Sequence, residues 1–564
     1  MTSKALTVAP RMSSPVPVDL ALGGINGGQS TSRETALWRP STVSPDQAIN
    51  LVKTVADARA TDMAVNDPLS QHAVRVNRNS IVGAMYRLNA KPNYRVIYGN
   101  DSDAAVEYGE ELAAVVEARF NLAAESENCY FDAGGMMTFT DMVRLAVGSA
   151  TLTGEAFGAV EWEDHRDRPF NTCIQMVSPS RVRNKNGLPD ANYPDGSKLR
   201  RGIYMTRSGR PISFQVSKGH PSEFYDLRAD EFVEVPAELK WGRKQMIFIR
   251  EALQIDQTRG LSEMVAALSH IKMTKNFSEI TLQNAVINAS YAASIESELP
   301  PAEIFAAMGG GPEGFESAVG KYLSMLQSYL GASDNIVIDG AKIPTFFPGT
   351  KMRMQPMGTP GGVGSDFHAA LIRNVAIALG QSPADLSRDF SRTNYSGLKG
   401  ELALAERDTN VRKRAWADRW ATGVYRLWFE EEMAAGNLPL PPGRNRSDFY
   451  RGGGLMKDAY TQCTWIGSGR GQIDEPKETA AALARIDGGL STYEKECARL
   501  GEDFREIFAQ RRKEERLART YGIPLVRSAA QTQLEAAKLA AVEQPDDDDE
   551  EDDIDDRANE GEEE

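Results

Sequence analysis

The spacing of apolar residues predicts four helices in the first third of the chain. Ser44 before Pro45 is typical of a helix N-terminus, because the hydroxyl can accept hydrogen bonds from free backbone N–H groups and proline fits the first turn. A second helix is predicted to begin at Pro68, to carry Leu88 on its apolar face and to end just before Pro92. Two further helices are predicted over 102–121 and 140–153.

From Glu155 to about Ile255 the pattern changes to short β-rich runs separated by turns such as Asn186-Gly187 and Asp195-Gly196. This alternation of short β-rich runs and turns predicts a small β-domain. The predicted strands cover 156–162, 172–177, 202–205, 212–216 and 245–249.

Two long helices with a compact insertion between them are predicted next. Residues 261 to about 293 read as one helix, which at about 1.5 Å per residue would be nearly 50 Å long. Residues 298–345 read as a loop, a helix and a strand over 335–339. After a Gly-rich linker, a helix is predicted to be capped by Ser365 and stopped by Gly380.

The rest of the chain reads as a polar loop over 383–397, a long helix over 398–435 and two or three helices over 475–520. Helices and strands do not alternate regularly along the sequence. The predicted fold class is therefore α+β, without a repeating β-α-β series.

Composition limits the possible classes of protein. Hydrophobic residues make up 41% and charged residues 25% of the 564 residues, which is typical of a globular protein. We expect no membrane-spanning helix and no secretion signal. Four widely spaced cysteines indicate free thiols of a reducing cytoplasm and not a disulfide framework or a zinc site.

The net charge of -15 belongs almost entirely to the end of the chain. Residues 546–564 hold 14 acidic residues and one arginine, so the other 545 residues carry 65 acidic against 63 basic groups. We expect this tail to be disordered, because it repels itself and has almost nothing to bury. Residues 1–43 are rich in Ser, Gly, Pro and Thr and are expected to form a flexible arm.

The motifs of common enzymes are missing from the sequence. It contains no P-loop, no H-E-x-x-H pair and no Gly-x-Ser-x-Gly, so we expect no catalytic residue, no metal and no cofactor. Glu161 and Glu163 are two residues apart on a predicted strand, as in some two-metal nucleases. A solvated strand face is the favoured interpretation, because no third acid or histidine supports them.

A set of cationic and polar residues at the end of the 383–397 loop is the candidate nucleic-acid interface. Such side chains can contact phosphates without reading bases, although an ordinary surface loop remains the alternative. On the helix that follows, Trp416 and Trp420 share one face among several arginines, which favours a packing helix over a nucleic-acid stripe. The candidate residues are Arg388, Arg392, Thr393, Asn394, Tyr395 and Lys399.

The order of these features resembles the portal proteins of tailed bacteriophages, specifically the lambda family. The most specific stretch is SDFHAALIRNVAIALGQSPADLSRDFSRTNYSG, at 365–397. The other stretches that carry the resemblance are 67–86, 257–260, 347–349 and 473–508.

The resemblance implies a ring, typically of twelve subunits, at one capsid vertex, through which double-stranded DNA enters and leaves. It also implies that the large terminase subunit supplies ATP hydrolysis, that a major capsid or scaffold protein and a head-completion or neck protein are partners, and that the virion is assembled in the host cytoplasm. A non-channel minor capsid or adaptor protein and a packaging nuclease are the alternatives.

The resemblance further implies a division of the chain. Its portions would be the wing (44–260), a stem helix (261–293), the clip (294–350), a linker with the second stem helix (351–380), a tunnel loop facing the channel (381–397) and a wing and crown region of helices (398–523). The arm (1–43) and the acidic tail (524–564) lie outside the resemblance.

Overall fold

The computed structural model divides the chain into two compact units, one of Met1–Ile81 with Leu122–Asn437 and one of Val82–Asn121 with Leu438–Glu564. Most of the predicted arm and clip, the linker over 351–362, Arg392 and the acidic tail lie outside the residues that the structure describes. The described residues are 37, 40–164, 168–223, 225, 230–291, 324, 336–338, 341–343, 363–391, 393–469 and 471–523.

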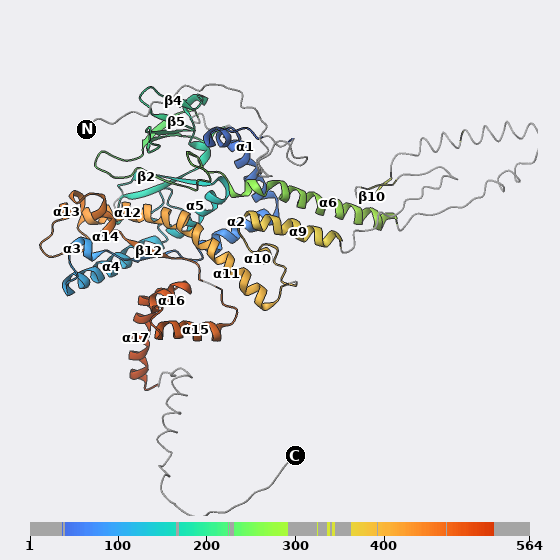
Figure 1. Ribbon diagram of the computed structural model, residues 1–564. Helices are drawn as coiled ribbons and strands as arrows, with labels where there is room; N and C mark the ends of the chain where they lie inside the picture. Colours follow the sequence, from blue (N-terminus) through green and yellow to red (C-terminus); the bar gives the residue numbers. More distant parts are fainter. Residues whose placement is uncertain are drawn as a thin grey trace, which may run out of the picture. The chain divides into compact units, whose positions relative to one another are not determined.

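Three helices that pack together begin the first unit: α1 (Pro45–Asn66), α2 (Pro68–Ile81) and α5 (Phe139–Thr153) (Figure 1). The Ser44 hydroxyl accepts a hydrogen bond from the backbone N–H of Gln47 at 3.3 Å, as the sequence predicted. The prediction of a helix from Pro68 almost to Pro92 is wrong, because α2 ends at Ile81.

Two antiparallel sheets form the predicted β-domain. Its core includes Phe157, which stacks on Phe248 with ring centroids 4.6 Å apart. All five predicted strands are present to within about a residue. The sequence did not predict the short strands β4 (Ala191–Asn192) and β5 (Lys198–Arg200) or the largely exposed β8 (Phe232–Pro236). The three-stranded sheet has the order β3 (Thr172–Val177), β2 (Glu155–Trp162), β9 (Met246–Arg250). The five-stranded sheet runs β4 (Ala191–Asn192), β5 (Lys198–Arg200), β6 (Ile203–Met205), β7 (Pro211–Ser217), β8 (Phe232–Pro236).

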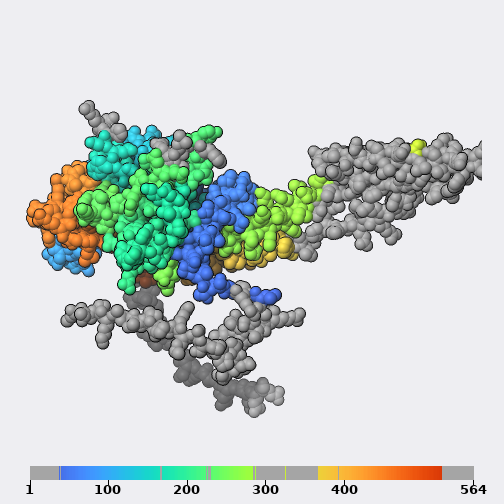
Figure 2. Space-filling model, turned by 90° about the horizontal axis from the view of Figure 1, so that it is seen from above, coloured from blue at the N-terminus to red at the C-terminus, as the bar shows by residue number. Residues whose placement is uncertain are grey.

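Helices α6 (Leu268–Tyr291) and α9 (Val363–Ala378) lie side by side, and α6 projects from the body of the first unit (Figures 1 and 2). Phe277 of α6 meets Phe367 of α9 edge to face, with centroids 5.5 Å apart. A 3₁₀ turn (Glu263–Ala266) precedes α6. Ser365 was predicted to cap α9 but lies inside it, because α9 begins at Val363. Between the two helices, β10 (Ile336–Ile338) confirms the predicted strand and pairs with β11 (Ala341–Ile343).

The long helix predicted over 398–435 is present but begins three residues earlier and contains one π-helical turn. It comprises α11 (Tyr395–Arg412), the π turn (Lys413–Ala417) and α12 (Asp418–Ala435). Trp416 and Trp420 are fully buried, and Trp420 lies so close to Gly158 that a Cβ there would be 2.5 Å from its ring. The packing interpretation of the tryptophans is therefore confirmed.

The second unit is mostly helical. Leu88, predicted to be helical, lies instead on β1 (Arg87–Ala90), which pairs with β12 (Cys463–Ile466). Glu117 joins two parts of this unit, since its carboxylate accepts the N–H of Ala90 at 2.7 Å and pairs with Arg505 at 3.0 Å. The helices of this unit are α3 (Tyr94–Tyr98), α4 (Asp103–Ala124), α13 (Arg446–Arg451), α14 (Gly453–Tyr460), α15 (Glu475–Asp487), α16 (Tyr493–Arg499) and α17 (Phe504–Tyr521).

Two sequence expectations concern the chain as a whole. Among the described helices, none has the length and apolar character required to cross a membrane. The four cysteines all lie among the described residues and none is joined in a disulfide, so they form no disulfide framework.

Candidate nucleic-acid interface and its buried support

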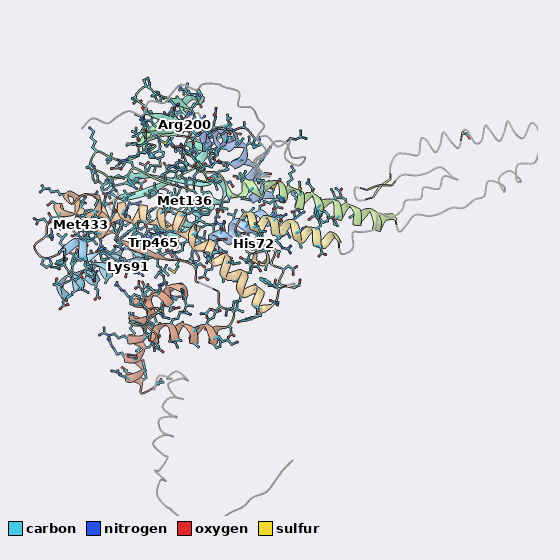
Figure 3. The ribbon with its side chains drawn as sticks, in the orientation of Figure 1. His72, Lys91, Met136, Arg200, Met433 and Trp465 are labelled. Atoms are coloured by element: carbon cyan, nitrogen blue, oxygen red, sulfur yellow. The ribbon has the colours of Figure 1, made fainter. Side chains whose placement is uncertain are left out.

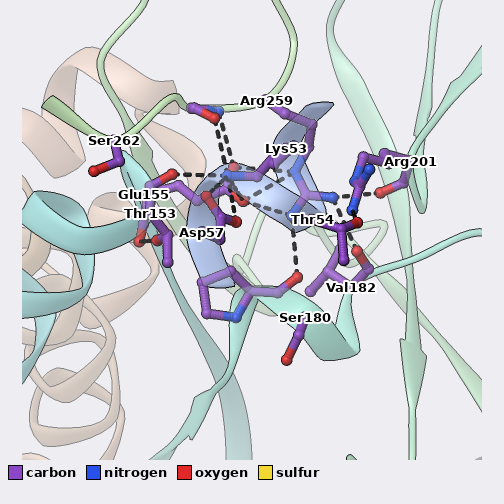
Figure 4. Close-up of polar contacts among 12 residues, drawn as sticks. Lys53, Thr54, Asp57, Thr153, Glu155, Ser180, Val182, Arg201, Arg259 and Ser262 are labelled. Atoms are coloured by element: carbon purple, nitrogen blue, oxygen red, sulfur yellow. Dashed lines mark hydrogen bonds and ion pairs between the residues drawn. The ribbon is translucent and has the colours of Figure 1, made fainter. Parts of the chain in front are cut away.

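A buried ionic cluster lies where the chain leaves the β-domain for α6 (Figure 4). The Nε of Arg259 donates to both carboxylate oxygens of Glu155, at 3.1 and 3.0 Å, and the Nζ of Lys53 lies 3.2 Å from the same carboxylate. None of the three side chains is more than 1% exposed. Burial raises the pKa of Glu155, but Arg259 and Lys53 outweigh it and hold that pKa below its ordinary value.

The remaining donors of this cluster are satisfied by backbone carbonyls from several elements. Lys53, on α1, donates to the carbonyls of Thr153 and Gly260 at 2.7 and 2.9 Å. Gly260 crosses Gly154 so closely that a Cβ on it would be 2.1 Å from the Gly154 oxygen. Arg259 donates to the carbonyls of Pro179, Val182 and Arg201. The cluster therefore fastens α1, the β-domain and the start of the α6 segment to one another.

Asp57 is the fourth charged residue of the cluster and the one nearest to solvent. Its carboxylate lies 3.0 Å from the Nζ of Lys53. Burial raises the pKa of Asp57 to about 6, and the opposing attraction of Lys53 does not cancel this effect.

The 381–397 segment was predicted to be a loop but contains the short helix α10 (Pro383–Ser387). The side-chain amide of Gln381 donates to the carbonyl of Ala73 at 2.8 Å and to Asn77 Oδ1 at 2.9 Å, both on α2. Ser382 caps α10 and donates to Glu401 of α11 at 2.8 Å. Helices α2 and α11 therefore fix the position of the segment.

Arg388 ends α10 with its side chain 64% exposed. Its guanidinium lies 3.4 Å from the carboxylate of Asp385, and its Nε donates to His72 Nε2 at 3.2 Å. Arg388 is therefore an exposed cation with a defined position. The contact of His72 with this segment could not be predicted, because no local sequence pattern links residues 316 positions apart.

The other candidate residues that the structure describes make different kinds of contact. Asn394 is the N-cap of α11, and its side chain accepts the N–H of Gly397 at 2.7 Å. The backbone N–H of Thr393 donates to the Phe390 carbonyl at 3.2 Å. Tyr395 and Lys399 are exposed on the first turns of α11, with the ammonium 6.0 Å from the ring centroid. The structure thus brings Tyr395 and Lys399 together and gives Asn394 a structural role.

The carboxylates considered as nuclease ligands are not assembled into a metal site. Glu161 is exposed on β2, while Glu163 pairs with Arg168 at 3.4 Å. In the described part of the chain, no group of three or more His, Cys, Asp or Glu side chains could hold a metal ion.

The comparisons with known proteins agree with one another. Residues 31–413 match the family described as phage portal protein, lambda family. The chain is 32% identical over 503 residues to the portal protein of Escherichia phage N15, covering 89% of this chain and 90% of that protein. It is also 32% identical over 500 residues to portal protein B of Escherichia phage lambda, covering 88% and 90%. The chain therefore belongs to the lambda family of phage portal proteins.

As a member of this family the protein is a structural component of the phage head–tail connector and not an enzyme, as the sequence predicted. Among solved structures, a chain from the neck of an empty gene transfer agent particle matches with a TM-score of 0.34 and 13% identity, covering 84% of this chain and 99% of that chain.

Proposed function

We propose that the protein assembles into a ring, typically of twelve subunits, at one vertex of the capsid, and that double-stranded DNA passes through its channel during packaging and ejection. The observation that carries this proposal is the 32% identity to portal protein B of phage lambda over 90% of that protein. Docking of the large terminase subunit, of a capsid or scaffold protein and of a head-completion or neck protein, and assembly in the host cytoplasm, are parts of the same proposal.

The surface of α6 supports a ring. Met273 and Ile280 lie within about 20° of each other around the helix, whereas Leu282 and Val286 lie roughly on the opposite side. All four are at least 45% exposed. The face that Phe277 turns toward α9 lies between these two apolar flanks. The remaining face is exposed and polar, with Lys272, Asn276, Glu279 and Gln283.

Two different apolar flanks on one helix favour assembly into a ring. An isologous dimer needs a single self-complementary patch, whereas a ring needs two patches that meet between successive copies. We therefore propose that α6 and α9 form the stem and that the Met273 flank of one copy packs against the Leu282 flank of the next. Residues 44–260 and 398–523 would form the wing and crown.

Within the ring, we propose that the 381–397 segment faces the channel and contacts DNA phosphates. Arg388 and Lys399 supply exposed positive charges, and Arg392 adds another in the sequence. Apart from the tail at 546–564, the chain is nearly neutral. A channel with few cations holds the DNA backbone weakly, so the duplex can slide without reading of its bases.

Removal of the two arginines tests this role of the segment. In a phage that carries Arg388→Ala with Arg392→Ala, the protein should assemble into normal rings. DNA should be packaged or retained about tenfold less well, because each ring loses its repeated phosphate contacts. Plaque yield and the DNA content of purified particles measure the effect. Arg210→Ala is the matched control, since the Arg210 side chain is exposed on the β-domain and pairs with Glu238. If assembly fails with no separate packaging defect, the arginines are structural.

A further inference from the structure

His72, a residue of α2, is labelled in Figure 3. One nitrogen of its ring lies between two groups of the α10 segment. His72 Nε2 is 3.2 Å from the Nε of Arg388 and 3.1 Å from the carbonyl oxygen of Asp385. A guanidinium N–H can only donate, and a carbonyl oxygen can only accept. The imidazole nitrogen therefore binds Arg388 when it carries no hydrogen and Asp385 when it carries one, but never both at once.

The backbone of Arg388 turns its side chain toward these partners. Its φ of 57° is in the left-handed region, which a residue with a Cβ adopts at some cost. In this conformation the guanidinium lies back along α10, 3.4 Å from the carboxylate of Asp385. The arginine is thus held by two partners while more than half of its side chain stays open to solvent.

His72 itself is fixed in place by the packing beneath it. The next two residues of α2, Ala73 and Val74, belong to a buried apolar cluster that also contains Leu386 of α10. Gln381 donates to the Ala73 carbonyl at 2.8 Å. The distance between the imidazole and the end of α10 is therefore set by the core.

We propose that His72 is a positioning residue for Arg388. With Nε2 free of hydrogen, the imidazole accepts the Arg388 Nε–H and, together with Asp385, keeps the guanidinium folded back on α10. A phosphate that approaches must displace both partners, so each contact with DNA is weakened. In the other tautomer, Nε2 donates to the Asp385 carbonyl and Arg388 loses this acceptor. The inference rests on the proposed contact of this segment with DNA.

The effect of His72 on the accessibility of Arg388 can be measured without DNA. In the full-length protein, the rate at which a dicarbonyl reagent modifies Arg388 is followed by peptide mass spectrometry. His72→Phe removes the acceptor and should raise the rate about fivefold, the equivalent of one hydrogen bond. His72→Gln retains an acceptor oxygen and should remain near the wild-type rate. Should the Phe variant fail to fold, His72→Ala provides the same comparison.

His220→Phe is the matched control, because His220 bonds Ser180 on the β-domain at 2.8 Å and should leave the rate at Arg388 unchanged. The proposal is wrong if Arg388 is modified at the same rate in His72→Phe as in wild type. It is also wrong if Arg388 is modified equally fast in the His72→Gln and His72→Phe variants.

A double-mutant cycle then tests the consequence for DNA. His72→Phe should strengthen the salt-sensitive binding of a DNA fragment to the purified protein, and the same change should have no effect in an Arg388→Ala background. If the effect persists without Arg388, His72 does not act through it and the inference is wrong. If instead the proposed contact of this segment with DNA is wrong, DNA binding would not depend on Arg388 in any variant. The rate of Arg388 modification would still be higher in His72→Phe than in His72→Gln.

Discussion

At the residue scale, the chain places a charged cluster in its interior and compensates every charge. Glu155, Lys53 and Arg259 are each at most 1% exposed, and their donors and acceptors all find partners. Such a cluster contributes less net stability than its contacts suggest, because each ion loses its hydration. Removing one member is costly, since the others stay buried and unpaired.

Glu155→Gln preserves the volume of the side chain but leaves the charges of Arg259 and Lys53 without their carboxylate. It should lower the free energy of unfolding of the first unit by about 3–5 kcal/mol, measured by urea denaturation. Glu238→Gln is the control, because its partner Arg210 is 72% exposed, and it should change stability by less than about 0.5 kcal/mol. A similar small change for Glu155→Gln would show that the cluster is not electrostatically coupled.

Asp57 gives this cluster a pH dependence of known sign. Because its pKa rises from 3.8 to about 6 on folding, the folded state binds the proton more tightly. The contribution of Asp57 to stability therefore falls as the pH rises from about 4 to 6 and is constant above that range, with a total change of at most about 3 kcal/mol. The free energy of unfolding should therefore fall between about pH 4 and 6 more steeply in wild type than in Asp57→Asn. Asp62→Asn changes an exposed residue of the same helix and should show the pH dependence of wild type. Parallel curves for the Asp57 variant would contradict this result.

Few of these residue roles could be predicted from the sequence. The cationic character of Arg388 and Lys399 was visible, because charge needs no fold to be recognised. The contacts of Arg259 with Glu155 and of His72 with Arg388 span 104 and 316 positions, and neither lies in a local pattern. Asn394 was named only as a candidate DNA contact, which stays a prediction. Asn before a helix is also a preferred cap, and the structure shows this cap.

At the element scale, long or strongly periodic segments were predicted well and ambiguous ones poorly. The strands around Phe157 and the helix of Trp416 and Trp420 were predicted because their apolar spacing reflects burial on one face. The stretch after Ile81 was assigned to a helix because Leu88 continued the spacing. Its pairing with β12, more than 370 residues away, determined the outcome.

The apolar flanks of α6 lead to a prediction about assembly. Ile280→Glu places a charge on one flank, and burying it between copies without a partner is unfavourable. The protein concentration needed for assembly should rise at least about tenfold, while the circular dichroism spectrum stays unchanged. Light scattering after size-exclusion chromatography measures the mass of the assembly. Gln283→Glu adds the same charge to the polar face and should assemble normally; equal behaviour of the two variants would show that this flank is not an interface.

At the scale of the whole molecule, membership of the portal family combines these parts. The sequence stretches at 365–397 and 473–508 already indicated the family, and the match over 31–413 with 32% identity to two phage portal proteins establishes it. The division into wing, stem, clip and tunnel segment stays a prediction. So do the roles of the arm, of Arg392 and of the acidic tail, which lie wholly or mostly outside the described residues.

Electron microscopy of the purified full-length protein, combined with its mass in solution, tests the central claim most directly. The account predicts closed rings with an open centre and a mass of about twelve chains of 61.8 kDa. A protein that remains a single compact chain at every salt and protein concentration would contradict it.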